Sequence, residues 1–264
     1  MDRRSQFTGY SGDNWVIAMK QFVQSFLEKF GYRLVKIDAL CRTRYGLTTF
    51  FPLMKQLGFT PASIVDVGAN HGDWTRTALR YFPDAQYTLI EPQDQLKVHI
   101  QDLIDRGYRI RWISAGAGDQ PGVIPFSISH RDDSCTFAID ELEARSLGYQ
   151  RVDVNIVTLN DICKSQDIPM PDMVKIDAEG FDLKVLQGAS ELLGKTEIFL
   201  VEFGIFCGYE NSLLELVRWM TNHGYRPLDI TDLNRSPKHG ILWLGEMAFV
   251  RNDTRLLDRV ASYE

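Results

Sequence analysis

The sequence contains no apolar run that approaches the roughly 20 residues of a membrane-spanning helix. Its opening stretch, MDRRSQFTGYSGDNW, lacks the apolar segment that follows the basic residues of a secretory signal peptide. The four cysteines show neither a CxxC pair nor the spacing of metal ligands. We therefore expect a cytoplasmic protein with reduced thiols and no membrane contact.

Blocks of lysine and arginine are absent as well, and the formal net charge is −6. This balance argues against the phosphate backbone of a nucleic acid as the main partner. The chain also has no internal repeat, no low-complexity segment and no long linker rich in Pro, Gly or Ser. With 264 residues, of which 44% are hydrophobic, it can bury one sizeable core. We expect one α/β domain at residues 59–264, preceded by a helical extension at residues 1–58 that packs on it.

What is present is a strand, a glycine turn and a helix in residues 64–74, which read IVDVGANHGDW. The β-branched residues that open this stretch are typical of a strand buried on both faces of a parallel sheet. Gly68 and Gly72 bracket the turn, and Asp73 is a good N-cap for a helix at residues 74–81. This is the first βα unit expected of a Rossmann-like, doubly wound fold, in which ligands bind at the carboxyl ends of the strands. A purely structural glycine turn is the alternative.

Strands and helices alternate along the chain, which predicts a mostly parallel, doubly wound sheet. A final hairpin is expected to close this sheet with an antiparallel strand, followed by a terminal helix at residues 254–260. Two further strands flank a polar loop in residues 121–158, and such an insertion is typical of a segment that carries specificity. The strands are expected at residues 64–67, 85–90, 109–114, 123–129, 151–158, 173–177, 197–201, 226–231 and 246–251.

Two helices are expected before the first strand. Residues 14–30 carry an amphipathic apolar stripe, which needs a partner surface. That partner is the domain's own core, a second copy of the chain, or the active site, which the helix would cover as a lid. Residues 50–58 form the second helix, with Thr48 or Thr49 as its cap and Pro52 in its first turn.

Two acidic residues, Asp66 and Glu91, end consecutive predicted strands and should face the same crevice. Glu91 follows the glycine turn by about 20 residues, which is the usual position of a carboxylate that binds a ribose diol. The turn lacks the second glycine of a dinucleotide fingerprint, since Asn70 stands there, and no GK[ST] of a phosphate-binding loop follows. The expected ligand is therefore S-adenosylmethionine, whose ammonium group would suit Asp66, directly or through water.

Several short motifs, in this order and spacing, resemble the FkbM family of S-adenosylmethionine-dependent methyltransferases. The similarity extends over residues 57–203, and KIDAEG is its most specific part. The family more often has Val than Ala at position 178, and Asp than Asn at position 160. The motifs are DVGAN at residues 66–70 with Gly72, IEP at 90–92, TLND at 158–161, VKIDAEG at 174–180 with VLQGA at 185–189, and VE at 201–202.

The resemblance implies a class I methyltransferase fold, in which seven strands form the sheet and the last is antiparallel. It implies that the glycine turn binds the methionine end of the cofactor, that Glu91 binds the ribose, and that Asp119 is the partner of the adenine amino group. For Asp119 an ordinary turn acid is the alternative. The cofactor-binding residues so implied are Asp66, Gly68, Asn70, Gly72, Glu91, Gly118, Asp119 and Asp177.

The acidic turn after the strand at residues 173–177 is the expected place of the chemistry. Asp177 ends that strand at the edge where the donor methyl group should lie, and Glu179 follows it. Two carboxylates so placed could orient a substrate, deprotonate a hydroxyl, or hold Mg²⁺, for which the sequence offers no third ligand. Capping of the next helix is the structural alternative.

Methyl transfer from a sulfonium mainly needs in-line alignment and a dry site, and a hydroxyl acceptor must also lose a proton. His130 in the inserted loop and Glu202 after the strand at residues 197–201 are the competing bases, next to Asp177. A solvated loop residue is the alternative for His130. Ser134, Glu179 and Glu202 are the expected substrate contacts.

The leading expectation is O-methylation of a hydroxyl on a small molecule, because the family's acceptors are commonly sugars or secondary metabolites. N-methylation of an amine or amide, which needs no base, stays open. Asn70 argues against a nicotinamide-dependent oxidoreductase, and the acids at the strand ends argue against a non-catalytic nucleotide-binding domain. A homodimer through the N-terminal helices also stays open.

Overall fold

The computed structural model describes residues 46–129, 135–164, 168–206 and 211–258, together with Val23 and Val260. The chain divides into two compact units, Met1–Arg44 and Tyr45–Glu264, and the description below concerns the second. The predicted helix at residues 14–30 thus lies outside the described residues, apart from Val23. Among the described residues, no helix combines the length and the apolar composition needed to cross a bilayer.

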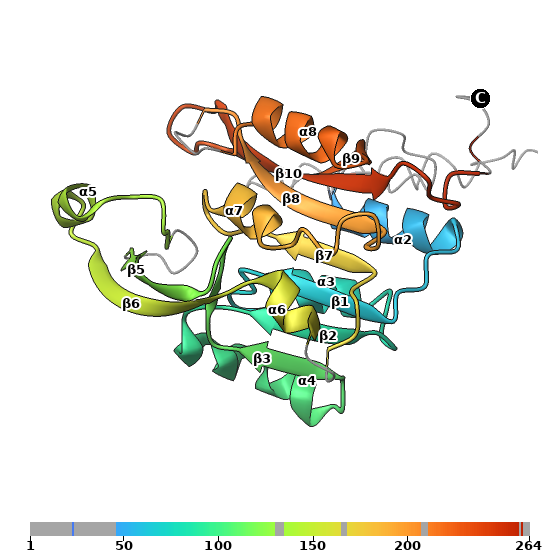
Figure 1. Cartoon of the computed structure of the whole chain (residues 1–264), viewed down its shortest axis with the longest axis horizontal. Coiled ribbons are helices and arrows are strands. Elements are labelled where there is room, and N and C mark those ends of the chain that lie inside the picture. Colours follow the sequence, from blue (N-terminus) through green and yellow to red (C-terminus); the bar gives the residue numbers. More distant parts are fainter. Residues whose placement is uncertain are drawn as a thin grey trace, which may run out of the picture. The chain divides into compact units, whose positions relative to one another are not determined.

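A seven-stranded sheet forms the centre of this unit, with the strand order β3-β2-β1-β7-β8-β10-β9 (Figure 1). The strands from β3 to β8 pair in parallel, and β10 is antiparallel to both of its neighbours. This arrangement confirms the predicted doubly wound sheet with an antiparallel last strand. The bounds are β1 Ser63–Val67, β2 Gln86–Ile90, β3 Ile110–Ile113, β7 Met173–Ile176, β8 Ile198–Gly204, β9 Tyr225–Arg235 and β10 Leu242–Arg251.

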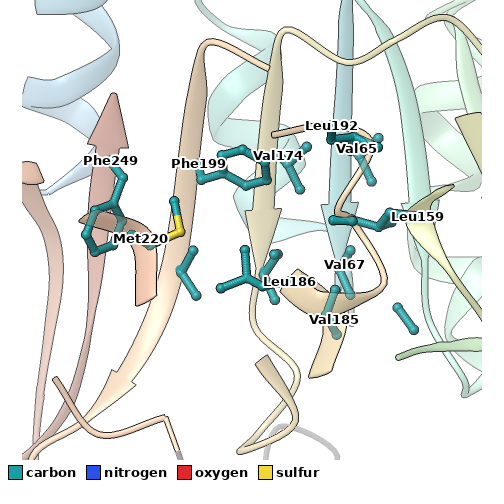
Figure 2. Close-up of a cluster of buried hydrophobic side chains, with 14 of the residues drawn as sticks. Val65, Val67, Leu159, Val174, Val185, Leu186, Leu192, Phe199, Met220 and Phe249 are labelled. Atoms are coloured by element: carbon teal, nitrogen blue, oxygen red, sulfur yellow. The ribbon is translucent and has the colours of Figure 1, made fainter. Parts of the chain in front are cut away.

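Helices cover both faces of this sheet, which explains why β1, β7 and β8 are buried along their whole length. Successive side chains of a strand point to opposite faces, so Val65 and Val67 pack on one cluster and Ile64 packs on the other. Figure 2 shows the first cluster, in which side chains of β1, β7, β8 and β10 meet those of the covering helices. On this face lie α6 Leu159–Lys164, α7 Asp182–Gln187 and α8 Leu213–Asn222; on the other lie α2 Leu47–Gln56, α3 Asp73–Leu79, the 3₁₀ helix η1 Asp94–Ile100 and α4 Gln101–Asp105.

Helix α2 begins earlier than the sequence pattern predicted. Gly46, rather than Thr48 or Thr49, is its N-cap, and its carbonyl oxygen accepts from the amides of Thr49 and Phe50. Pro52 consequently lies beyond the first turn. Three apolar side chains of this helix are fully buried in the second cluster, so α2 packs as part of the described unit; they are Phe50, Phe51 and Met54.

A smaller sheet of order β4-β6-β5 carries the predicted insertion (Figure 1). Its strands are β4 Gly116–Ala117, β5 Gly122–Ile128 and β6 Gln150–Val157; β5 and β6 are the two expected strands, and they pair antiparallel. The short helix α5, Glu141–Ser146, lies between them, and Asp140 caps it by accepting from the amide of Glu143. His130 and Ser134 fall outside the described residues.

The predicted terminal helix is wrong for the described part of residues 254–260, which forms turns instead. Thr254 makes one local and one distant bond: its amide donates to the carbonyl of Arg251, and its hydroxyl donates to the carboxylate of Glu197. The guanidinium of Arg251 also contacts Glu197, at 3.2 Å. These contacts fix the chain to the start of β8 without a further helical turn.

Gly188, at the end of α7, offers a test of the close packing between this helix and the segment that follows β4. A Cβ atom placed on Gly188 would lie 1.9 Å from the carbonyl oxygen of Gly118, whereas one on Gly122 would meet nothing within 4 Å. Neither glycine has a positive φ. We expect Gly188→Ala to lower the free energy of unfolding by about 1–3 kcal/mol through overpacking, and the matched Gly122→Ala to change it by less than about 0.5 kcal/mol. Urea denaturation measures both, and equal effects of the two substitutions would contradict this packing.

Candidate active site

The glycine turn after β1 is pressed against the end of β7. The amides of Gly68 and Ala69 both donate to the carbonyl of Ile90 in β2. A Cβ atom on Gly68, whose φ is +69°, would lie 1.8 Å from the carbonyl oxygen of Asp177. Only glycine fits there, because both the left-handed conformation and the close approach exclude a side chain. The turn ends at Gly72, which is the N-cap of α3 with a φ of +78°, so the prediction of Asp73 as the cap was wrong by one residue.

Glu91, which follows β2, points its carboxylate at this turn. One oxygen accepts from the amide of Asn70 and the other from the amide of Gln93, each at 3.0 Å. Burial raises the pKa of Glu91, and these two amides oppose the increase. The side chain is 3% exposed and lines a cavity. The side chain of Gln93 also hydrogen-bonds this carboxylate. A carboxylate has about four acceptor positions, so about one stays available for a ligand's hydroxyl group.

This first cavity lies at the carboxyl ends of β1, β2 and β7. Its floor and walls include Gly68, Asn70, Glu91 and Asp177. The inserted segment closes one side with Phe126, Cys135 and Phe137, which the sequence analysis did not assign to the site. Their signal in the sequence is weak, because nothing in the spacing of aromatic residues tells a cavity wall from an ordinary core. Gly116 and Ala117 of β4 also line this cavity, and a Cβ atom on Gly116 would lie only 2.6 Å from the ring of Phe137.

A buried lysine, which the sequence analysis also missed, connects the end of β7 to β1 and the glycine turn. The Nζ atom of Lys175 in β7 lies 3.3 Å from Oδ1 of Asp66 and 3.3 Å from Oδ2 of Asp177. It also donates to the carbonyl oxygens of Val67, at 3.3 Å, and Gly68, at 2.9 Å. Burial lowers the pKa of Lys175, but the carboxylates of Asp177 and Asp66 raise it more, and the ammonium stays charged.

Asp66 itself does not line the first cavity. It is fully buried, it accepts from the hydroxyl of Thr75 at 2.6 Å, and its β-sheet partner in the register is Lys175. Burial raises its pKa, and Lys175 and Thr75 lower it in part. The sequence predicts that Asp66 contacts the ammonium group of the ligand, directly or through water. In the structure this carboxylate lines neither cavity and holds Lys175, and the ligand contact stays a prediction. An acid and a lysine in two adjacent buried strands are the signal that could have indicated the pair.

The turn between β7 and α7 is fixed by Asp182, not by the two acids that precede it. The Asp182 carboxylate accepts from the amides of Ala178 and Gly180 and from the side chain of Asn211. Burial raises its pKa to about 7. The N-cap of α7 is Phe181, which makes no side-chain capping bond. The structural alternative for Asp177 and Glu179, a helix cap, is therefore wrong.

Asp177 also lines a second cavity, on the side of β8, β9 and β10. Other walls come from Trp74 of α3, Lys175, Glu202 and Glu246. Burial raises the pKa of Glu246 to about 7, against the hydrogen bond that it accepts from Thr231. Burial also raises the pKa of Glu202 well above its usual value, and nearby carboxylates raise it further. The two cavities thus meet at one carboxylate, Asp177, whose side chain is 39% exposed.

Not all predicted residues come together in this site. Gly72 packs against Ile100 and lines neither cavity. Gly118 lies against Gly188 and Phe181, and Asp119 is exposed, so the predicted contacts of both with adenine are not seen in the walls of the first cavity. The chain turns outward toward β5 at this point. The residues that could hold a metal ion are Asp177, Glu179 and Glu202, of which one oxygen each lies within 4.8 Å of the others.

Comparison with known proteins identifies the sequence family. Residues 66–227, more than half of the chain, match the profile of the methyltransferase FkbM domain. The 2-O-methyltransferase NoeI of Sinorhizobium fredii (strain NBRC 101917 / NGR234) is 26% identical over 161 residues. That match covers 57% of this chain and 66% of the relative, just under two thirds of its length.

Solved structures show only a distant likeness. The 1,6-didemethyltoxoflavin-N1-methyltransferase of Burkholderia thailandensis is 15% identical, with a TM-score of 0.44, and the match covers 94% of each chain. TrmK of M. capricolum is 11% identical, with a TM-score of 0.46, over 78% of this chain and 67% of that one. No residue role is carried over from them.

Removal of the buried cation tests the Lys175 network. We expect Lys175→Met to lower the free energy of unfolding by about 3–5 kcal/mol near pH 7.5, because it leaves Asp66 buried without its counter-ion. The loss should shrink toward pH 5. Without Lys175, folded Asp66 takes up a proton that the unfolded chain does not bind, so the stability of the variant rises as the pH falls toward the usual pKa of aspartate.

Urea denaturation at both pH values measures this effect. Lys238→Met, which removes an exposed lysine, is the control and should change stability by less than about 0.5 kcal/mol. A loss below 1 kcal/mol, or one that is the same at both pH values, would show that Lys175 does not support Asp66.

Proposed function

The chain belongs to the FkbM methyltransferase family, and we propose that it transfers the methyl group of S-adenosylmethionine to a hydroxyl group of a small molecule such as a sugar or secondary metabolite. One observation carries the proposal: two cavities at the carboxyl edge of the sheet meet at Asp177. A donor in one cavity and an acceptor in the other would then approach each other across a single carboxylate. The sulfonium supplies a methyl group that is already activated.

The first cavity suits the donor. Glu91 has about one acceptor position left for a ribose hydroxyl, and its rotamer is already fixed by the amides of Asn70 and Gln93. Gly68 and Asn70 of the glycine turn line this cavity, so the methionine end can lie against the turn. Phe126 and Phe137 cover the cavity with apolar surface and help to exclude water. Asp66 and Lys175 are buried, and they hold the turn and Asp177 in place.

The second cavity suits a hydroxylated acceptor. Carboxylates accept hydrogen bonds from hydroxyl groups, and this cavity presents those of Asp177, Glu202, Asp232 and Glu246. Trp74 offers an apolar face for a ring. Glu202 lines this cavity, and its carboxylate is the group that we assign to take the proton of the hydroxyl as the methyl group moves. That NoeI is named a 2-O-methyltransferase favours oxygen over nitrogen as the acceptor atom.

Binding of S-adenosylhomocysteine tests the assignment of the donor cavity. We expect Glu91→Ala to weaken binding at least tenfold, since a hydrogen bond to a charged group contributes about 1.5–3 kcal/mol. Asp119→Ala, which removes an exposed acid outside both cavities, should leave affinity within about twofold. Isothermal titration calorimetry gives the dissociation constants.

Asp177→Asn should change the affinity for S-adenosylhomocysteine by no more than about threefold, because Asp177 borders the donor cavity but does not face the ribose. Thermal melting checks that each variant is folded. The assignment would be overturned if wild type failed to bind at millimolar ligand, or if Asp177→Asn weakened binding more than Glu91→Ala.

A further inference from the structure

Three carboxylates converge where the two cavities meet. Asp177 follows β7, Glu179 lies in the next turn, and Glu202 lies in β8, which runs beside β7. One oxygen of each carboxylate lies within 4.8 Å of the other two. In the register of the sheet, Ile176 of β7 pairs with Val201 of β8, so the two acids that follow these residues are neighbours. The cluster therefore follows from the topology and not from a chance surface rotamer.

Glu202 indicates that this cluster is built for a ligand. Its side chain is 6% exposed, and its Oε2 atom has no hydrogen-bond partner among the described residues. A buried carboxylate oxygen without a donor is unfavourable, because it has lost its hydration without gaining a hydrogen bond. The ion pairs of Lys175 among the described residues join it to the carboxylates of Asp177 and Asp66. One oxygen of the Glu202 carboxylate lies within 4.8 Å of an oxygen of Asp177 and of Glu179, which are acceptors as well.

The backbone that carries the cluster is held rigidly. The side-chain amide of Asn211 donates both to Asp182, at 2.8 Å, and to the carbonyl oxygen of Glu202, at 3.0 Å. Asp182 in turn holds the turn that contains Glu179. The hydroxyl of Thr136 donates to the carbonyl of Glu179 at 2.6 Å. One hydrogen-bond system thus fixes both elements that present the carboxylates, as a preorganised site requires.

We propose that Asp177, Glu179 and Glu202 bind one divalent cation of the Mg²⁺ and Mn²⁺ class. The donors are carboxylate oxygens without nitrogen or sulfur, which suits hard cations, and three such ligands leave room for the water molecules that Mg²⁺ retains. The place of the site, between the cavities, would let the cation ligate oxygen atoms of the acceptor; this role, unlike the binding itself, rests on the proposed function. The third ligand, Glu202, lies 23 positions after Glu179 in the sequence and is brought to it by β8.

Titration of Mn²⁺ into the full-length protein, freed of metal with EDTA and then dialysed, tests the site directly. Electron paramagnetic resonance of free Mn²⁺ gives the bound fraction. We expect one Mn²⁺ per chain, with a dissociation constant below about 100 μM and displacement by Mg²⁺. Glu202→Gln and Glu179→Gln should each weaken binding at least tenfold. Asp232→Asn, which removes an exposed carboxylate of the second cavity outside the cluster, should leave binding within about threefold.

Absence of binding at millimolar Mn²⁺, or equal binding by wild type and both cluster variants, would overturn the site. S-adenosylhomocysteine binding by the same preparations separates this failure from that of the proposed function. Protein that binds S-adenosylhomocysteine but no Mn²⁺ would contradict the metal site alone, and protein that binds Mn²⁺ but no S-adenosylhomocysteine would contradict the proposed cofactor alone. Thermal melting of the two glutamine variants checks their folding.

Discussion

The ammonium group of Lys175 is the contact on which the rest of the site depends. It lies in a fully buried strand and holds two carboxylates and two backbone carbonyls, which belong to the ends of β1 and β7 and to the glycine turn. A charge so buried is unfavourable unless every donor position is used. The contacts of Lys175 with Gly68 and Asp177 fix the glycine turn and hold Asp177 at the edge of the sheet. Asp66 supports Lys175. The first and the second cavity therefore share Asp177 as a lining residue, and Lys175 fixes its position.

The remaining acids divide into supports and contacts according to burial. Asp66 and Asp182 are fully buried, and their carboxylates accept hydrogen bonds from donors of the protein itself. Glu91 accepts hydrogen bonds from the turn and also lines the first cavity. Asp177 and Glu202 face the second cavity, where a hydroxyl group or a cation can use them. In the proposed reaction the protein supplies alignment and a proton acceptor, as an activated methyl donor requires.

The fold could be predicted largely from the sequence because its strands are short apolar runs that end at Gly, Glu or Asp. The strand before Gly68 and the strand before Glu91 both appear where their patterns place them, and the final hairpin closes the sheet. The helix expected near residue 254 fails because the hydroxyl of Thr254 is used by Glu197, a partner far away in the sequence. Local patterns contain no information about such a partner.

For the site, sequence spacing identified acids at strand ends. It did not show which of them support the turn and which line a cavity. That Asp66 supports and Glu91 lines a cavity depends on the register of β1 against β7, where Asp66 faces Lys175. The role of Glu202 as a neighbour of Glu179 likewise depends on how β8 lies beside β7. The walls contributed by Phe126 and Phe137 depend on the packing of the insertion, for which the sequence has no motif. His130 and Ser134, outside the described residues, stay predictions.

A crystal structure with bound S-adenosylhomocysteine tests the central claim most directly, namely that donor and acceptor occupy separate cavities that meet at Asp177. The account predicts that the ribose hydroxyls contact Glu91 and that the sulfur atom lies on the first-cavity side of Asp177, with the second cavity left free for the acceptor. A ligand whose adenosine fills the second cavity, or whose sulfur atom points away from Asp177, would contradict it.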